Sequence, residues 1–416
     1  MTTSATLLPE IFDNIKVIDA DTHYSEPHDL WVKRAPAAMK KRVPRVETID
    51  GILSWVIDDS LVIGRGATAS SSITKAGLKP PGLACVDWRN DDVHPGSYDV
   101  RARVGVMNET GIFAQVVYPN ILGFGGQHSA KVDPALRLLS VQIYNDAVAE
   151  MQTESGQRIF PMALLPWWDV AAAVTETKRC HAMGLRGINI NSDPHGHKDP
   201  AGNPLPDLGQ PYWDPLWEIC VGLDLPVNFH IGASEQAMDW MGTQGWPGLS
   251  FEMRAALGGS MLFVNNARVM GNIILSGVLD RYPALKFVSV ESGIGWIPFM
   301  LESFDFQYLE ITTGRPLKLA PSEYFRRNFY ACFWFEQRNL RQVIENVGAD
   351  NCMFETDFPH PTCLYPAPLT RCTAALATLD KVTRRKVLSE TAARVYKIAL
   401  GPGTQLSATQ PGFRDR

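Results

Sequence analysis

Acidic residues, asparagines and histidines stand at the ends of several apolar segments of this sequence. They are Asp19, Asp21, His23, Asn189, Asn191, His230, Glu291 and Asp357. Asp21 and His23 are two positions apart, so in an extended strand their side chains share one face and can reach one ion. Carboxylate and imidazole groups together suit Zn, Mn or Fe(II), and a site without thiolates is typical of a catalytic metal. The pattern therefore indicates a catalytic site for a divalent metal ion.

Each of these residues taken alone has a simpler explanation. His230 can be a hydrogen-bonded core histidine, Asp21 can cap a helix, and Asp357 in TDFPHP can form an Asx turn. Their recurrence at four separate strand ends is what favours a shared metal site, provided that those strands end at one place.

Eight apolar segments alternate with longer stretches of helical composition, which predicts strand–helix units around a parallel sheet. The segments begin at Lys16, Phe113, Phe160, Leu185, Pro226, Lys286, Asn328 and Cys352. The expected helices span 134–153, 169–183, 214–222, 265–279, 295–310, 336–347 and 381–400. Eight such units predict an α/β fold of the (β/α)8 TIM-barrel class, with an open doubly wound sheet as the alternative. In a barrel, the carboxyl ends of all strands meet at one mouth.

We expect a single domain over 1–416 with an insertion at 43–101, after the first strand. The run VETIDGILSWVIDDSLVIG alternates as a small β-hairpin, and a Gly/Pro/Ser-rich stretch follows it. Its length and its position predict that the insertion covers the barrel mouth. Two further long loops, after the fourth strand and at 233–249, belong to the same face.

Composition excludes several classes of protein. With 45% hydrophobic and 20% charged residues, the 416-residue chain can bury a sizeable core. Its 39 basic and 44 acidic residues leave a net charge of -5, which argues against nucleic acid or an anionic membrane as a partner. The start of the chain lacks the pattern of a secretory signal, so we expect a cytoplasmic protein. Its seven cysteines form no CxxC pair and are expected to be reduced thiols.

The motifs DADTHYSEP, FHIG, ESGIGWIPFMLE and ETDFPHP resemble the metal-dependent amidohydrolase-related family that includes aminocarboxymuconate semialdehyde decarboxylase. The similarity runs from about Val17 to the C-terminal helix, except over 43–101. It implies a (β/α)8 barrel that holds a divalent metal through two residues of strand one, a His of strand five and an Asp of strand eight. Carried over, the metal ligands are Asp21, His23, His230 and Asp357. The resemblance also implies a homodimer.

The sixth strand departs from the family pattern. The decarboxylases of the family have the motif HxG there, whereas this chain has ESG with Glu291. Asp21 and Asp357 already neutralise one divalent cation, so an ionised Glu291 would add an uncompensated buried charge. Glu291 is therefore expected to be a protonated general acid, or else a ligand of a second metal ion. Capping of the following helix is the third alternative, although Ser292 is the better cap.

Three functional hypotheses follow from the sequence. The preferred one is a metal-dependent hydrolase that attacks an amide, ester, thioester or lactone carbonyl with a metal-activated water, in which His230, Glu291 and Asp357 are catalytic. The alternative is a non-oxidative decarboxylase of an aromatic or unsaturated acid. A metal-binding barrel without activity is the third.

The expected substrate is a small molecule, and its contacts are placed less firmly by the sequence than the metal ligands are. The candidates are His360, Trp296, Asn191 and Arg186, with Arg89 and Arg268 as further clamps for a carboxylate. Aromatic residues at or after strand ends could line an apolar pocket; these are Trp167, Trp240, Trp246, Trp296 and Phe358. The histidines of the loop after the fourth strand, His195 and His197, are expected to be exposed.

Overall fold

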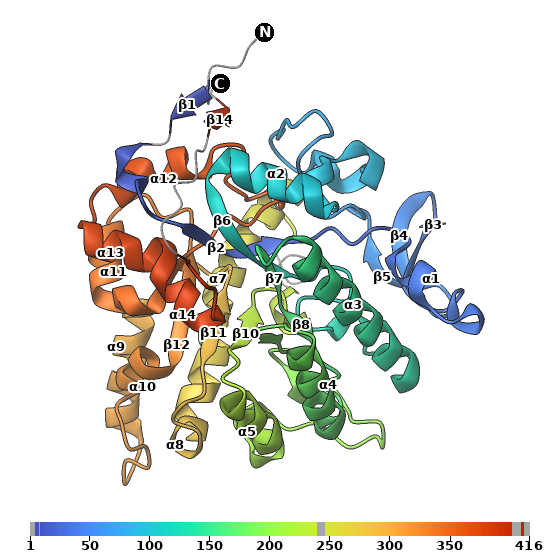
Figure 1. Cartoon of the computed structure of the whole chain (residues 1–416). Helices are drawn as coiled ribbons and strands as arrows, with labels where there is room; N and C mark the ends of the chain where they lie inside the picture. The colour runs from blue at the N-terminus through green and yellow to red at the C-terminus, as the bar shows by residue number, and fades with distance from the viewer. Residues whose placement is uncertain (1–4, 8, 239–245, 402–408, 412–416) are drawn as a thin grey trace.

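The computed structural model describes residues 5–7, 9–238, 246–401 and 409–411. Its central strands run in parallel and are surrounded by helices (Figure 1). In chain order they are β2 (Val17–His23), β6 (Ile112–Tyr118), β7 (Ile159–Pro161) with β8 (Ala163–Leu164), β9 (Ile188–Asn189), β10 (Val227–His230), β11 (Phe287–Val290), β12 (Phe329–Phe333) and β13 (Cys352–Phe354). Each lies within or beside one of the eight predicted segments, so the predicted strand order is confirmed.

Hydrogen bonds join these strands into a barrel. The third strand is interrupted at Met162, whose N–H donates to Val117, and the next residue, Ala163, donates to Gly187. It therefore pairs with the β2–β6 side through β7 and with the β9–β13 side through β8. The first and last strands meet through a parallel bridge between Thr22 and Phe358. The predicted α/β barrel is thus confirmed, and its first and eighth strands meet where the polar residues are.

Several helices begin and end close to their predicted limits. They are α3 (Pro134–Glu154), α4 (Val170–Ala182), α5 (Asp214–Gly222), α9 (Ile297–Ile311) and α11 (Leu340–Val347). Asp133 and Asp169 start α3 and α4, because each carboxylate accepts two of the first N–H groups of its helix.

Other helices differ from the sequence prediction. The helix α7 (Phe251–Leu275) begins well before position 265, and α8 (Val278–Arg281) follows it. The expected helix 381–400 is divided into α13 (Lys381–Arg385), a π-helical turn (Lys386–Glu390) and α14 (Thr391–Tyr396). Helices that the sequence prediction missed are α1 (Leu30–Arg34), α2 (Val100–Thr110), α6 (Glu235–Met238), α10 (Pro321–Asn328) and α12 (Pro368–Leu376). The buried face of α2 includes Arg103 and Thr110 beside three apolar residues, so it is not a simple apolar stripe.

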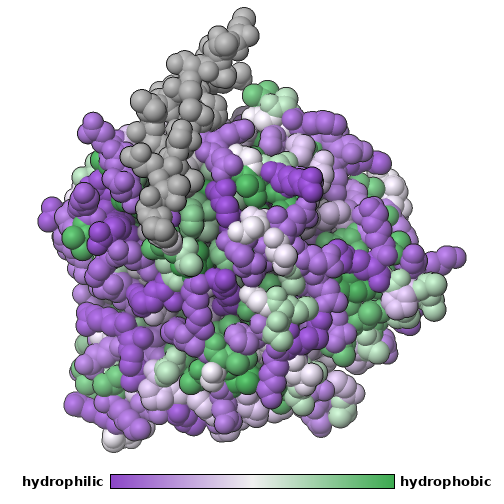
Figure 2. All heavy atoms as spheres, in the orientation of Figure 1, coloured by the Kyte–Doolittle hydropathy of each residue, from purple (hydrophilic) through white to green (hydrophobic). Residues whose placement is uncertain are grey.

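The core has two layers, as a barrel requires. Residues such as Ile18, Val116 and Val290 fill the barrel interior, while a larger cluster packs between the strands and the surrounding helices. Hydrophilic residues cover most of the face shown in Figure 2, with small apolar patches between them. All seven cysteines are buried and form no disulfide. Within the described ranges, no helix is long and apolar enough to cross a membrane.

The insertion 43–101 contains three antiparallel strands, β3 (Arg45–Ile49), β4 (Ile52–Ile57) and β5 (Leu61–Arg65), rather than the expected hairpin. Its sheet lies beside α1 at the edge of the molecule (Figure 1), where Trp55 of β4 meets the Trp31 ring edge to face. A short pair of strands, β1 (Ala5–Leu7) and β14 (Thr409–Pro411), lies near the two chain ends.

Candidate metal centre

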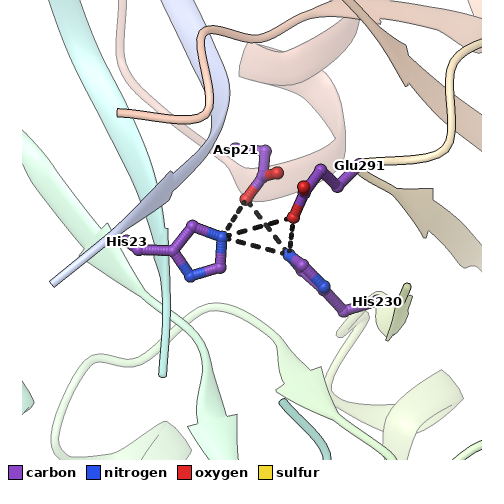
Figure 3. A group of neighbouring side chains, drawn as sticks. All are labelled: Asp21, His23, His230 and Glu291. Carbon is purple, nitrogen blue, oxygen red and sulfur yellow. Dashed lines mark hydrogen bonds and ion pairs between the residues drawn. The ribbon is translucent and has the colours of Figure 1, made fainter. Parts of the chain in front are cut away.

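Five side chains from four strand ends meet at the barrel mouth. Asp21 and His23 lie at the end of β2, and His230 is the last residue of β10. Glu291 follows β11 directly, and Asp357 follows β13. Four of them, without Asp357, converge in Figure 3. The parallel strands therefore bring the sequence-predicted residues to one place.

The distances between these side chains are those of a compact cluster of ligand atoms. The Nε2 atoms of His23 and His230 are 3.2 Å apart. Asp21 Oδ1 is 3.7 Å from His23 Nε2 and 3.6 Å from His230 Nε2. Glu291 Oε2 is 3.2 Å from His230 Nε2. The ligand atoms of these four residues all lie within 4.8 Å of one another, so a single ion can contact them all.

The backbone sets the tautomer of His230. Its Nδ1 lies 2.6 Å from the carbonyl oxygen of Ile231, to which it donates a proton. The neutral ring then has its lone pair on Nε2, the atom that faces the cluster. His230 is therefore oriented as a metal ligand.

Asp21 behaves as a carboxylate that needs a cation. Its side chain is fully buried, and within the described part of the chain neither oxygen accepts a hydrogen bond. A buried carboxylate without a partner is costly, so this donor set fits a divalent ion. The structure thus contains a possible metal site at Asp21, His23 and His230.

A second set of possible ligands overlaps the first and includes His360. It consists of His23, Glu291, Asp357 and His360. His360 Nδ1 is 3.0 Å from Asp357 Oδ1, and its ring stacks on His23 with 3.7 Å between centroids. The other Asp357 oxygen accepts a hydrogen bond from Thr362. The structure therefore brings His360 into the cluster, through its contacts with Asp357 and His23.

The backbone is strained at two of these residues. Glu291 has φ 51° and Asp357 has φ 57°, in the left-handed region that non-glycine residues seldom adopt. Such conformations concentrate at functional sites, where the surrounding structure holds them in place. Neither Glu291 nor Ser292 caps α9, which begins after Trp296 without a side-chain cap. The cap alternative for Glu291 is therefore wrong.

Burial and mutual repulsion shift the protonation of the cluster. Burial, followed by the charges of Asp357 and Asp21, raises the pKa of Glu291 well above its usual value. Burial likewise raises the pKa of Asp21. It lowers the pKa of His23 well below its usual value, with His360 and His230 adding to the effect. Three carboxylates this close favour a bound cation or a retained proton.

Behind the cluster lies a fully paired group that we call the rear network: Asp19, Arg103, Gln115 and Thr356. Asp19 accepts hydrogen bonds from the Thr356 N–H (2.8 Å), the Thr356 hydroxyl (2.6 Å) and Gln115 Nε2 (3.1 Å). Arg103 donates to Gln115 Oε1 at 2.7 Å and to the backbone carbonyl of His23 at 2.9 Å. Asp19, which lies within β2, is thus a structural residue. Arg103 has no motif that would reveal it in the sequence.

Sequence reasoning also missed four residues at the mouth. They are Glu26, Asn120, Phe124 and Glu355. The ring of Phe124 stacks on His230 with 4.3 Å between centroids. Its loop, YPNILGFGGQ, is glycine-rich and follows the second strand directly. That pattern is the feature of the sequence that could have indicated a residue at the barrel mouth. Glu355 is fully buried, and burial and the neighbouring carboxylates raise its pKa well above the usual value.

The remaining predicted substrate contacts lie at different places. Asn191 is buried beside Gly125 of the Phe124 loop, and its Oδ1 accepts a hydrogen bond from the Asp193 N–H. Trp296 donates to the Ser292 carbonyl and packs on the outer core. Arg186 precedes β9 and donates to the carbonyl of Lys397. It therefore lies at the end of the barrel opposite the mouth, because residues before a parallel strand are at its amino end.

The other candidates add little to the site. Arg268 contacts Gln236 and Asp193, and Arg89 is exposed. His197 packs edge-on against Trp167 and is partly buried, contrary to expectation. The predicted pocket residue Trp240 lies outside the described residues.

Comparison with known proteins places the chain in a family. A family model described as amidohydrolase matches residues 18–398. The chain belongs to this amidohydrolase family. It is 26% identical over 343 residues to a gamma-resorcylate decarboxylase from Polaromonas sp. (strain JS666), covering 80% of this chain and 96% of the relative. It is 24% identical over 282 residues to a 2-amino-3-carboxymuconate-6-semialdehyde decarboxylase from Dictyostelium discoideum, covering 65% and 69%.

A solved relative shares the fold. The crystal structure of dihydroxybenzoic acid decarboxylase from Polaromonas sp. JS666, with bound manganese and the inhibitor 2-nitroresorcinol, matches with a TM-score of 0.58. It is 20% identical and covers 92% of this chain and 97% of that chain. The resemblance to the aminocarboxymuconate semialdehyde decarboxylase group is confirmed.

These comparisons correct the functional prediction. The chain is an enzyme of the amidohydrolase superfamily, but the preferred hydrolase hypothesis is wrong, because the relatives described above are non-oxidative decarboxylases. The alternative, decarboxylation, is the hypothesis that they support. Hydrolysis is the simpler inference from the sequence because it needs only a metal, a water and a base, and because no motif places an arginine to capture a carboxylate.

Proposed function

We propose that this enzyme is a metal-dependent non-oxidative decarboxylase of an aromatic or unsaturated carboxylic acid. The observation that carries the proposal is the convergence of two imidazole Nε2 atoms, 3.2 Å apart, with buried carboxylates at the barrel mouth. Asp21, His23, His230 and Asp357 are the proposed ligands. Manganese is the proposed metal, on the basis of the manganese-bound relative.

A divalent ion bound there would hold the carboxylate of the acid and offset its negative charge. When the C–C bond breaks and CO2 leaves, the bonding electron pair stays on the substrate carbon, which then takes up a proton. Glu291 is the proposed donor. Its side chain is 11% exposed, whereas those of Asp21, His23 and Asp357 are fully buried. Glu291 is therefore the carboxyl group of this cluster that a bound substrate can reach.

His360 and Asn191 are the proposed substrate contacts, together with Phe124. The Phe124 ring lies over His230 and offers an apolar wall for an aromatic or conjugated substrate. Stacking on such a wall holds a planar acid with its carboxylate directed at the metal ligands.

The insertion 43–101 is proposed to cover the mouth. Its Ser72 hydroxyl donates to the carbonyls of Pro359 and His360 in the loop that follows β13. Replacing the insertion with a short linker should leave the metal bound while activity collapses. Unchanged activity and substrate selectivity would show that the insertion is a surface segment unrelated to the active site.

A homodimer is proposed as the assembly. The outer face of α9 exposes several large apolar side chains, namely Phe299, Phe306, Leu309 and Ile311. A second copy that covered them would remove apolar surface from water. Light scattering of the purified protein tests this assembly.

The deciding experiment is an assay of released CO2 from the manganese-loaded enzyme. A panel of hydroxybenzoates, including 2,6-dihydroxybenzoate, and of unsaturated dicarboxylic acids serves as substrates. We expect CO2 from at least one acid, with loss of the signal when Asp21→Asn and His23→Ala are combined. The proposal is contradicted if fully metal-loaded protein releases CO2 from none of these acids.

A further inference from the structure

One buried arginine of this protein has no acidic partner among the described residues. Arg137, the fourth residue of α3, is 5% exposed, and its Nε and Nη2 atoms are buried without a hydrogen-bond acceptor from the described part of the chain. Burial lowers its pKa to about 10 and no carboxylate offsets this effect, so the side chain is charged at pH 7. A buried cation without a counter-ion is costly, which indicates that an anionic ligand completes the site.

A second buried arginine, Arg103, shows what a structural role requires in this fold. Its Nε donates to Gln115 Oε1 at 2.7 Å, its Nη1 to the His23 carbonyl at 2.9 Å, and its Nη2 to the Phe358 carbonyl at 3.4 Å. All three nitrogen atoms of that guanidinium are therefore paired within the protein. Arg137 differs from Arg103 at the two nitrogen atoms that face no acceptor.

Two tryptophans of the loop that follows β8 hold the Arg137 guanidinium in place. Its Cζ atom lies 3.6 Å from the centroid of the Trp168 ring and 5.3 Å from that of the Trp167 ring. A guanidinium this close to an aromatic ring presents its flat face, so its N–H groups remain free at the edge. Nε and Nη2 share one edge, and their parallel N–H groups match the two oxygens of a carboxylate.

Trp167 adds a third donor beside this edge. It is fully buried, and its Nε1–H also lacks an acceptor within the described ranges. A methyl group added at Gly126 would lie 3.4 Å from this nitrogen, so the N–H lies beside the loop of Phe124. The Phe124 ring in turn stacks on His230 of the metal cluster. The unpaired atoms are thus all donors, and they lie in the wall of the barrel mouth.

We propose that Arg137 and Trp167 form a binding site for a carboxylate, separate from the metal cluster. The Arg137 edge donates two hydrogen bonds to the carboxylate oxygens, and Trp167 Nε1 donates a third. The group is either a free carboxylate anion or a second carboxylate of the substrate, which decarboxylation would leave unchanged; only the latter source rests on the proposed function. Glu235 does not occupy the site, because it contacts His197 at 3.8 Å and forms no ion pair with Arg137.

The first test measures thermal unfolding of the manganese-loaded protein with acetate as the probe. Sodium acetate should raise the melting temperature of the wild type more than sodium chloride does at the same ionic strength, and Arg137→Met should lose that difference. Acetate bound at the metal contributes equally in both proteins. Arg137→Lys keeps the charge but not the paired N–H groups, so its affinity for acetate should fall at least tenfold. The same response to acetate in wild type and both variants overturns the proposal.

Arg103 supplies the matched control. Arg103→Lys also alters a buried arginine, and it should lower the melting temperature in both salts because hydrogen bonds within the protein are lost. The difference between acetate and chloride should remain in this variant. Its disappearance would mean that any change at a buried arginine removes the response, and would overturn the proposal.

Calorimetric titration of the manganese-loaded protein separates the two sources of the carboxylate. If the substrate supplies it, benzene-1,3- or benzene-1,4-dicarboxylate should bind wild type about tenfold more tightly than benzoate, and Arg137→Met should remove this advantage. If a free anion occupies the site, acetate and benzoate should bind together without competing, and only the affinity for acetate should fall in Arg137→Met. Affinities for all these acids that do not change in Arg137→Met overturn the proposal, whether or not the enzyme releases CO2.

Discussion

Asp19 and Asp21 lie two residues apart on the same strand and are both fully buried, yet their surroundings are opposite. Asp19 belongs to the rear network and accepts three hydrogen bonds. Among the described residues nothing donates a hydrogen bond to the carboxylate of Asp21, whose neighbours are the histidines of the metal cluster. In the rear network polar atoms are paired and hold strands together. In the metal cluster the carboxylate and imidazole atoms remain available to bind an ion. The electrostatic cost of burying them without partners is tolerated because the site needs them for function.

The largest effect is expected in the metal cluster. Replacing Asp21→Asn and His23→Ala together should abolish metal binding and lower decarboxylation by about 10⁴-fold or more, since both ligands of β2 are lost. The melting temperature of the metal-free variant should not fall below that of metal-free wild type, because buried like charges are removed. Elemental analysis and thermal unfolding measure the two effects. Full metal occupancy in the variant would contradict the ligand assignment.

The rear network should respond in the opposite way. Arg103→Met removes charge-assisted hydrogen bonds to the carbonyl of His23 and to Gln115, and should lower the free energy of unfolding by about 3 kcal/mol. The metal cluster itself stays intact, so metal stoichiometry at low temperature should be unchanged. Urea unfolding and metal analysis test this. Loss of metal without a lower free energy of unfolding would contradict the separate roles of the rear network and the metal cluster.

Glu26 is a buried carboxyl group outside both regions, and its effect on the free energy of unfolding can be tested through pH. Burial raises its pKa to about 7, against the ordinary 4.5, so the folded protein holds a proton that the unfolded chain releases. Its contribution to stability, about 3 kcal/mol, is fully present below pH 4.5 and is lost as pH rises through 7. Glu26→Gln should remove this contribution, so that the free energy of unfolding falls less steeply between pH 4.5 and pH 7. Urea unfolding across this pH range measures it, and identical slopes would contradict the shifted pKa.

A smaller effect is expected from the loop that carries Phe124. A methyl group added at Gly125 would lie 2.7 Å from Asn191 Cα, so Gly125→Ala should displace the loop and move Phe124 off His230. We expect kcat/KM to fall about tenfold with the metal retained. Gly196→Ala is the control, because no described atom outside its immediate chain neighbours lies within 4 Å of the added methyl. Equal losses in the two variants would argue against a positioned Phe124.

The smallest effect is expected at Arg186, which the sequence suggested as a substrate contact. Its guanidinium stacks over Phe160 and donates to the Lys397 carbonyl at the far end of the barrel. Arg186→Ala should change kcat and KM less than twofold. A rise of tenfold or more in KM would restore it as a substrate residue.

Much of the fold was predictable because the signals are local. Continuous apolar segments identified the eight strands, and capping residues such as Asp133 and Asp169 marked helix starts. The missed helix α2 buries Arg103 and Thr110 together with apolar residues, so its buried face is not an apolar stripe in the sequence. Its Arg103 is buried because backbone carbonyls distant in sequence meet around it, and no periodicity reveals that.

The sequence by itself determined which residues could serve as ligands and that they would share one end of a parallel sheet. Asp21 and His23 share a face because strand side chains alternate, and His230 and Asp357 follow strands that must end at the same mouth. Only the tertiary structure decided that the Asp19 carboxylate is hydrogen-bonded while the Asp21 carboxylate is not, and that Asn120 reaches His360. Each of these depends on contacts between residues far apart in the chain, such as Asp19 with Thr356, which form only when the first and last strands meet.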